Sequence, residues 1–94
     1  MIHAYKNAKT KKVHETGNPK GFKGLDGGRA LRVLNILKNA NSIDDLPILS
    51  AYWLHKLPKD RRGPFSMSAN LPWVVCFTPA RGGGWQDVAI TDEH

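Results

Sequence analysis

The second half of this chain consists of short, strand-like segments joined by turn sequences, and this pattern constrains the fold more than any other feature. The strand candidates are rich in aromatic and β-branched residues and span 52–57, 64–69, 73–78 and 85–91. The connections between them are rich in Pro, Gly and Asn, which are typical turn residues. Strands joined by such short connections pair antiparallel, because a parallel pair needs a longer crossover. The sequence therefore predicts a four-stranded antiparallel meander.

Two of these segments carry further information about their place in the sheet. Residues 73–77 are apolar on both faces, which predicts a central strand. The last segment alternates, with Val88 and Ile90 on one face and with Asp87, Ala89 and Thr91 on the other.

The first half of the chain predicts a short strand and two helices. Residues 2–5 alternate and read as a strand, and Asn7 is a suitable N-cap for a helix over 8–15 that stops at Gly17. In this lysine-rich helix the inward positions are expected to be Ala8, Val13 and Thr16.

Asp26 is a suitable N-cap for the second helix, which should end near Ala40. Its apolar stripe consists of Ala30, Leu31, Val33, Leu34 and Leu37, and Ile36 widens it.

The predicted fold is therefore a single α+β domain over 1–94: a short N-terminal strand, two helices, then a four-stranded antiparallel meander. The helices should cover one face of the sheet and leave the other face open. Cys76 lies inside an apolar run and is expected to be a small buried side chain.

The net charge of +6 is concentrated in two segments. Residues 1–24 hold six lysines against Glu15, and residues 56–62 hold four basic residues against Asp60. This distribution favours a polyanionic partner, either nucleic acid or an acidic protein. The chain has no apolar run of membrane-spanning length and no secretory h-region, so we expect a cytoplasmic protein without a membrane partner.

Two histidines near basic or acidic residues are the candidate catalytic groups. His55 opens a loop with Lys59, Arg61 and Arg62, and His94 follows Asp92 by two residues. RNA cleavage needs a base for the 2′-hydroxyl, an acid for the leaving 5′-oxygen and cations around the phosphorus. The same residues also fit an ordinary solvated turn and a frayed terminus, and the sequence pattern alone leaves both interpretations open.

Other familiar sites are not indicated by the sequence. Gly82-Gly83-Gly84 reads as a hairpin turn, since it lacks the Lys-Ser/Thr and the following helix of a phosphate-binding loop. The four histidines and one cysteine do not have metal-ligand spacing, so we expect neither a metal nor another cofactor. The aromatic residues Tyr52, Trp53, Phe65, Trp73 and Trp85 should mostly form core, although an exposed one could stack on a nucleobase.

The ordered set His55-x-Leu57-x-x-Asp60-Arg61-x-Gly63-x-x-Ser66, then Asn70, Trp73 and Phe77, then Val88-x-Ile90-x-Asp92-x-His94, resembles the HigB branch of the RelE/ParE toxin superfamily. These are toxins of bacterial toxin–antitoxin pairs. The resemblance extends over nearly the whole chain, and its motif residues concentrate in the last forty.

The resemblance implies a RelE-like, microbial-RNase-like fold and an endoribonuclease that cuts mRNA in the ribosomal A site without metal, inhibiting translation. By this resemblance His55, Asp92 and His94 are the acid/base residues, and Arg61 is the conserved arginine of the basic loop. Lys59 is a further candidate catalytic residue, although it stands next to Pro58, the position where the family often has a lysine. Lys56, Arg62, Arg81 and Glu93 are then the expected RNA-binding residues. The implied partners are the ribosome, mRNA and a helix-turn-helix antitoxin. The resemblance implies that operator DNA is bound only by the complex of the protein with this antitoxin.

The sequence departs from the family pattern at Glu93, where an aromatic is common, and at Val74, where an arginine is common. Lys59 or Arg81 is a candidate to replace the missing cation. Two alternatives follow: an inhibitor of DNA gyrase like the ParE branch, which would not need a terminal histidine, or a catalytically weak RNA- or protein-binding module.

Overall fold

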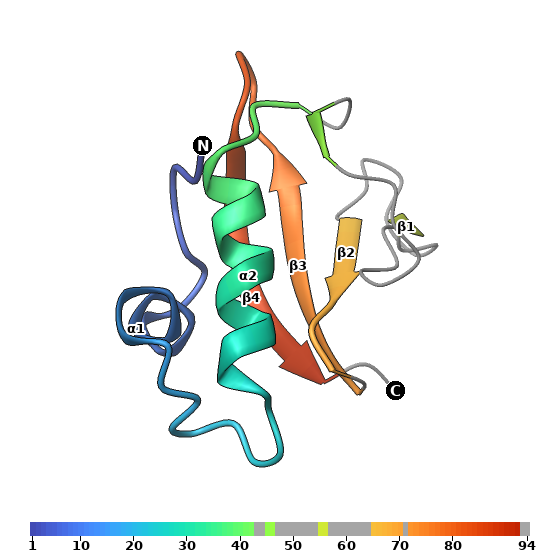
Figure 1. The fold of residues 1–94 in the computed structure, drawn as a ribbon. Coiled ribbons are helices and arrows are strands. Elements are labelled where there is room, and N and C mark those ends of the chain that lie inside the picture. The colour runs from blue at the N-terminus through green and yellow to red at the C-terminus, as the bar shows by residue number, and fades with distance from the viewer. Residues whose placement is uncertain (43–44, 47–54, 57–64, 71, 93–94) are drawn as a thin grey trace.

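The computed structural model describes residues 1–42, 45–46, 55–56, 65–70 and 72–92 (Figure 1). Within them the chain forms two helices followed by an antiparallel sheet, so the predicted α+β class is confirmed. Helix α2 packs against β3, and helix α1 packs against α2 and β4 (Figure 1). Among the described residues, no helix is long and apolar enough to cross a membrane.

Helix α1 spans Ala8–Thr16, and the sequence predicts both of its ends. At the start, the Asn7 side chain accepts a hydrogen bond from the Thr10 N–H at 2.9 Å. At the end, Gly17 adopts a left-handed conformation with φ of 73° and donates its N–H to the Val13 carbonyl at 2.7 Å.

The buried side of α1 differs from the prediction. Its buried residues are Thr10 and Val13, whereas Ala8 and Thr16 are exposed, so those two inward positions were predicted wrongly. Thr10 is buried because its hydroxyl accepts a hydrogen bond from the Ile90 N–H of the sheet at 3.0 Å. A polar side chain thus replaces an apolar one in the contact between helix and sheet.

Helix α2 spans Gly27–Lys38 and begins at the predicted N-cap, where the Asp26 carboxylate accepts from the Arg29 N–H at 3.1 Å. The predicted apolar stripe is largely confirmed, since Ala30, Val33, Leu34 and Leu37 are buried and Leu31 and Ile36 are half-buried.

The sheet has the strand order β1-β2-β3-β4 with antiparallel neighbours. Strands β2 (Phe65–Ser68), β3 (Trp73–Pro79) and β4 (Trp85–Asp92) make up most of it, and β3 is central as predicted. Of the first strand candidate, only β1 (His55–Lys56) is described, and it pairs with β2. The rest of that candidate lies outside the described residues.

The predicted N-terminal strand over 2–5 does not form as a strand. Instead, this segment makes two isolated parallel bridges to β4, at Ile2–Trp85 and Tyr5–Val88. Between these bridges Asp87 has a left-handed backbone with φ of 55°. This irregular backbone in β4 interrupts the continuous hydrogen-bond ladder that residues 2–5 would need in order to pair with β4 as a regular strand.

The same irregularity is a β-bulge that places Trp85 in the core. The register passes from Cys76–Ala89 to Thr78–Gln86, so two β4 residues stand opposite one residue of β3. The bulge resets the alternation, and Trp85 is fully buried on the side of Val88 and Ile90. The Trp85 indole N–H donates to the Leu37 carbonyl at 3.0 Å, which ties β4 to α2.

The second face of the sheet differs from the predicted open surface. Ser66, Ser68, Val74 and Ala89 lie on the face away from the core cluster, and all four are buried. Cys76 on the same face is half-buried, whereas the sequence predicted a buried side chain.

Candidate functional site

Four of the predicted site residues belong to the described part of the chain: His55 and Lys56 in β1, Arg81 in the β3–β4 turn, and Asp92 at the end of β4. The other five lie outside it, namely Lys59, Arg61, Arg62, Glu93 and His94. The roles predicted for these five therefore stay predictions.

The register places His55 in a row that crosses the whole sheet. His55 pairs with Ser66, Ser66 with Cys76, and Cys76 with Ala89. Directly opposed residues in antiparallel strands share a face of the sheet. The row therefore belongs to the face that α1 and α2 do not cover.

Asp92 has a different position in the same sheet. It pairs with Trp73 and falls in the alternation with Ile90, on the side of the core cluster. Counting strands and residues from the His55 row, Asp92 lies roughly 14 Å across and roughly 10 Å along the sheet. The described backbone thus does not bring these two predicted catalytic residues side by side.

Arg81 lies at the opposite end of β4 from Asp92, and its side chain is exposed. The strand between the turn and Asp92 is eight residues long, which corresponds to roughly 25 Å. Val74 belongs to the Asp92 end of the sheet, since it pairs with Thr91. Arg81 therefore does not replace the cation that the family pattern has at position 74.

The Val74 row is uncharged among the described residues. Val74 pairs with Ser68 on one side and Thr91 on the other, and only 1% of its surface is exposed. The structure brings no compensating basic side chain into this row within the described ranges.

Two serines of this face have buried hydroxyls without a hydrogen-bond partner among the described residues. They are Ser66 and Ser68, which are 0% and 5% exposed. A buried, unpaired hydroxyl costs about 1–3 kcal/mol. Thr10 serves as a comparison, because its side chain is equally buried but its hydroxyl accepts a hydrogen bond from the Ile90 N–H.

We expect Ser66→Ala to raise the free energy of unfolding by about 1 kcal/mol, because it removes an unpaired polar group. Thr10→Val should lower it by about 1–3 kcal/mol, because the buried Ile90 N–H then loses its acceptor. Urea denaturation of both variants measures whether the free energy of unfolding rises in Ser66→Ala and falls in Thr10→Val. A loss of stability in Ser66→Ala would show that its hydroxyl has a partner in the folded protein.

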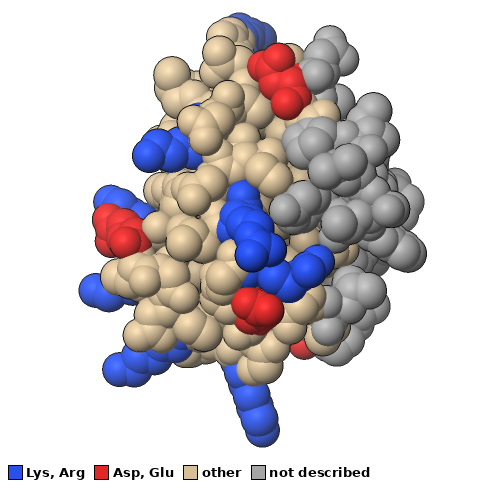
Figure 2. Space-filling model, in the orientation of Figure 1, with Lys and Arg blue, Asp and Glu red and all other residues tan. Residues whose placement is uncertain are grey.

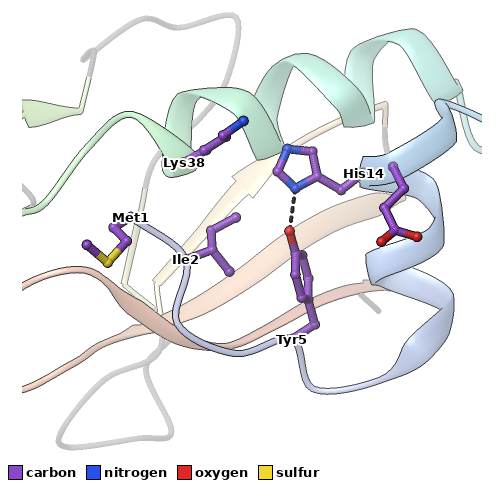
Figure 3. Close-up of a pocket in the computed structure, with 6 residues that line it drawn as sticks. Met1, Ile2, Tyr5, His14 and Lys38 are labelled. Carbon is purple, nitrogen blue, oxygen red and sulfur yellow. Dashed lines mark hydrogen bonds between the residues drawn. The ribbon is translucent and has the colours of Figure 1, made fainter.

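The sequence did not indicate a polar cluster on the other side of the molecule (Figure 3). Tyr5 donates its hydroxyl proton to His14 Nδ1 at 2.5 Å, in the tautomer whose Nε2–H donates to Asn35 at 2.9 Å. Tyr5 and His14 line a shallow hollow of about 460 Å³ together with Met1, Ile2, Glu15 and Lys38. These contacts join the N-terminal segment, α1 and α2, so they depend on how the three segments pack and no local sequence pattern could have revealed them.

The pKa of Tyr5 is raised, first by burial of its hydroxyl and then by the negative charge of Glu15. The folded protein therefore holds this proton more tightly than the unfolded chain does. The stability that this tighter proton binding contributes is fully present below about pH 10, the ordinary pKa of tyrosine. It is lost as the pH rises through the raised pKa of Tyr5 in the folded protein. We expect Tyr5→Phe to lose stability less steeply above pH 10 than the wild type, as measured by denaturation midpoints.

Among the described residues, no three histidine, cysteine, aspartate or glutamate side chains gather where they could hold a metal ion. No protein-family model matches this sequence, and no curated protein is significantly similar to it.

Proposed function

We propose that this protein is the toxin of a type II toxin–antitoxin system, of the HigB kind, and that it cleaves mRNA in the ribosomal A site. The observation that carries the proposal is the ordered set of motif residues from His55 to His94, in a chain that folds with two helices before an antiparallel sheet. The net charge of +6 suits an RNA substrate.

In the proposed reaction, a basic residue takes the proton of the 2′-hydroxyl as its oxygen attacks the adjacent phosphorus. An acidic residue gives a proton to the 5′-oxygen as the bond from phosphorus to that oxygen breaks. The products are a 2′,3′-cyclic phosphate and a free 5′-hydroxyl. In this proposal His55 and His94 supply the acid and base, and Asp92, two residues before His94, orients the His94 imidazole or holds its proton. Lys59 and Arg61 stabilise the negative charge on the phosphorane.

Lys56, Arg62, Arg81 and Glu93 complete the proposal as residues that contact the RNA. Because Arg81 and Asp92 lie at opposite ends of β4, an RNA that both residues contact must extend along the strand. The proposed partners are a helix-turn-helix antitoxin, the ribosome and mRNA, with operator DNA bound only through the antitoxin complex.

A translation assay tests this proposal against the gyrase alternative. Purified protein added to a cell extract should stop protein synthesis while DNA supercoiling by gyrase continues at its normal rate. Inhibition of supercoiling with intact translation would contradict the nuclease proposal and favour the ParE-like alternative.

A second candidate is a binding module of the same fold that cuts RNA weakly. It is favoured by the uncharged row of Ser68, Val74 and Thr91, in which Ser68 and Val74 are buried and where the family pattern provides a cation. Under this candidate, growth arrest by the protein in bacteria survives the combined substitution His55→Ala and His94→Ala. Under the nuclease proposal the same double variant permits growth.

A further inference from the structure

Six lysines near the N-terminus form one exposed surface. Lys9, Lys11 and Lys12 project from α1, Lys6 precedes it, and Lys20 and Lys23 follow in the next loop; all six are exposed. We refer to these six residues as the α1 basic surface. Basic side chains project along the side of the molecule where α1 lies (Figures 1 and 2).

The geometry of α1 makes this surface continuous. With about 100° of rotation per residue, Lys11, Lys12 and Lys9 follow one another around the exposed side of the helix. The Lys9 ammonium lies 5.7 Å from the centre of the Phe22 ring, which places it over the loop. Lys9 therefore connects the helical lysines to Lys20 and Lys23.

The charge of this surface is not neutralised within the described part of the chain. No ion pair between any of the six lysines and an acidic side chain is present there. Glu15 is the one acidic residue among residues 1–24. The surface therefore presents a strong positive potential to a partner.

The surface lacks the apolar anchors that a protein partner would need. Stable protein interfaces are centred on buried aromatic or aliphatic residues. Among the described residues, Met1 is the one large apolar side chain that is exposed. Single-stranded nucleic acid is bound by aromatic side chains that stack on its bases, and the described aromatic residues are all at least partly buried.

We infer that the α1 basic surface docks on the sugar–phosphate backbone of a folded, base-paired RNA, separately from the strand that is cut. Lysine ammonium groups bind phosphates as point charges and do not read base sequence. The inference deepens the proposed function and rests on it, since it adds an RNA contact outside the proposed cleavage site. It assigns the first quarter of the chain to docking and the sheet to cleavage.

Binding to a short RNA hairpin, measured by fluorescence anisotropy at several salt concentrations, tests this inference. The double variant Lys9→Gln, Lys12→Gln should weaken hairpin binding roughly tenfold near 0.1 M salt. The slope of log affinity against log salt should fall by about 2, one for each lost phosphate contact. The matched control is Arg32→Gln with Lys38→Gln, which removes the same charge from exposed positions of α2 and should leave the slope unchanged.

Three outcomes would overturn the inference. The first is an equal loss in both double variants, which would mean that net charge alone drives binding. The second is binding of a matched single strand as tightly as the hairpin. The third is competition by poly-glutamate as effective as that by hairpin RNA, which would identify an acidic protein as the partner.

The test separates this inference from the proposed nuclease activity. Loss of hairpin binding in the α1 variant, with a wild type that does not cut mRNA on ribosomes, would support the docking surface and contradict the nuclease. Cleavage on ribosomes by a variant whose hairpin binding is unchanged would support the nuclease and contradict the docking surface.

Discussion

Gly27→Ala is expected to lower the free energy of unfolding by about 3 kcal/mol, while Gly28→Ala beside it should raise it by about 0.5–1 kcal/mol. A Cβ atom at position 27 would lie 2.3 Å from the Gly17 carbonyl oxygen and 2.9 Å from Pro19 Cδ. The first obstacle is backbone, which cannot move aside as a flexible side chain can. The start of α2 therefore depends on this close approach to the end of α1.

Gly28 is the matched control for this prediction. It is exposed, and a Cβ atom there would come no closer than 3.4 Å to the Asp26 carboxylate. Alanine at this helical position reduces the entropy of the unfolded chain and introduces no clash. Urea denaturation followed by circular dichroism measures both variants. Similar effects at the two positions would contradict the tight contact between α2 and the end of α1.

His94→Ala and His55→Ala are each expected to reduce ribosome-dependent mRNA cleavage by about 10²–10⁴-fold, the usual contribution of a positioned acid or base. His3→Ala is the control, because His3 is an exposed histidine whose ring contacts the Gly83 carbonyl oxygen at 2.8 Å, in a turn. Unchanged cleavage in His94→Ala and His55→Ala would show that neither histidine takes part in the reaction. Circular dichroism of each variant checks that it is folded.

The sequence predicts the helices of this fold well because their signals are local. Asn7 and Asp26 cap their helices through contacts only three residues away. The apolar stripe of α2 likewise follows from its own periodicity. The inward side of α1 was harder to predict, because Thr10 is buried through a hydrogen bond to Ile90, eighty residues away.

The sheet was predicted less accurately because one residue changes its periodicity. A regular strand would place Trp85 with Asp87, away from Val88 and Ile90. The bulge at Asp87 instead places Trp85 in the core and leaves residues 2–5 as isolated bridges. Aspartate adopts a left-handed conformation more readily than most residues, but this preference does not by itself identify a bulge.

The candidate site was predicted from a pattern of residues, and its geometry depends on register, which the sequence does not give. Pairing places His55 with Ser66 and Cys76, and it places Val74 between Ser68 and Thr91. By contrast, the separation of Arg81 from Val74 follows from spacing along the chain, because Val74 lies near the start of β3 and Arg81 lies in the turn after it.

Mapping of mRNA ends after incubation with the purified protein and programmed ribosomes tests the proposed nuclease activity. We expect cuts within the A-site codon that depend on ribosomes and leave a 2′,3′-cyclic phosphate. Intact mRNA, or cuts made equally well by the His55→Ala, His94→Ala double variant, would contradict the proposal.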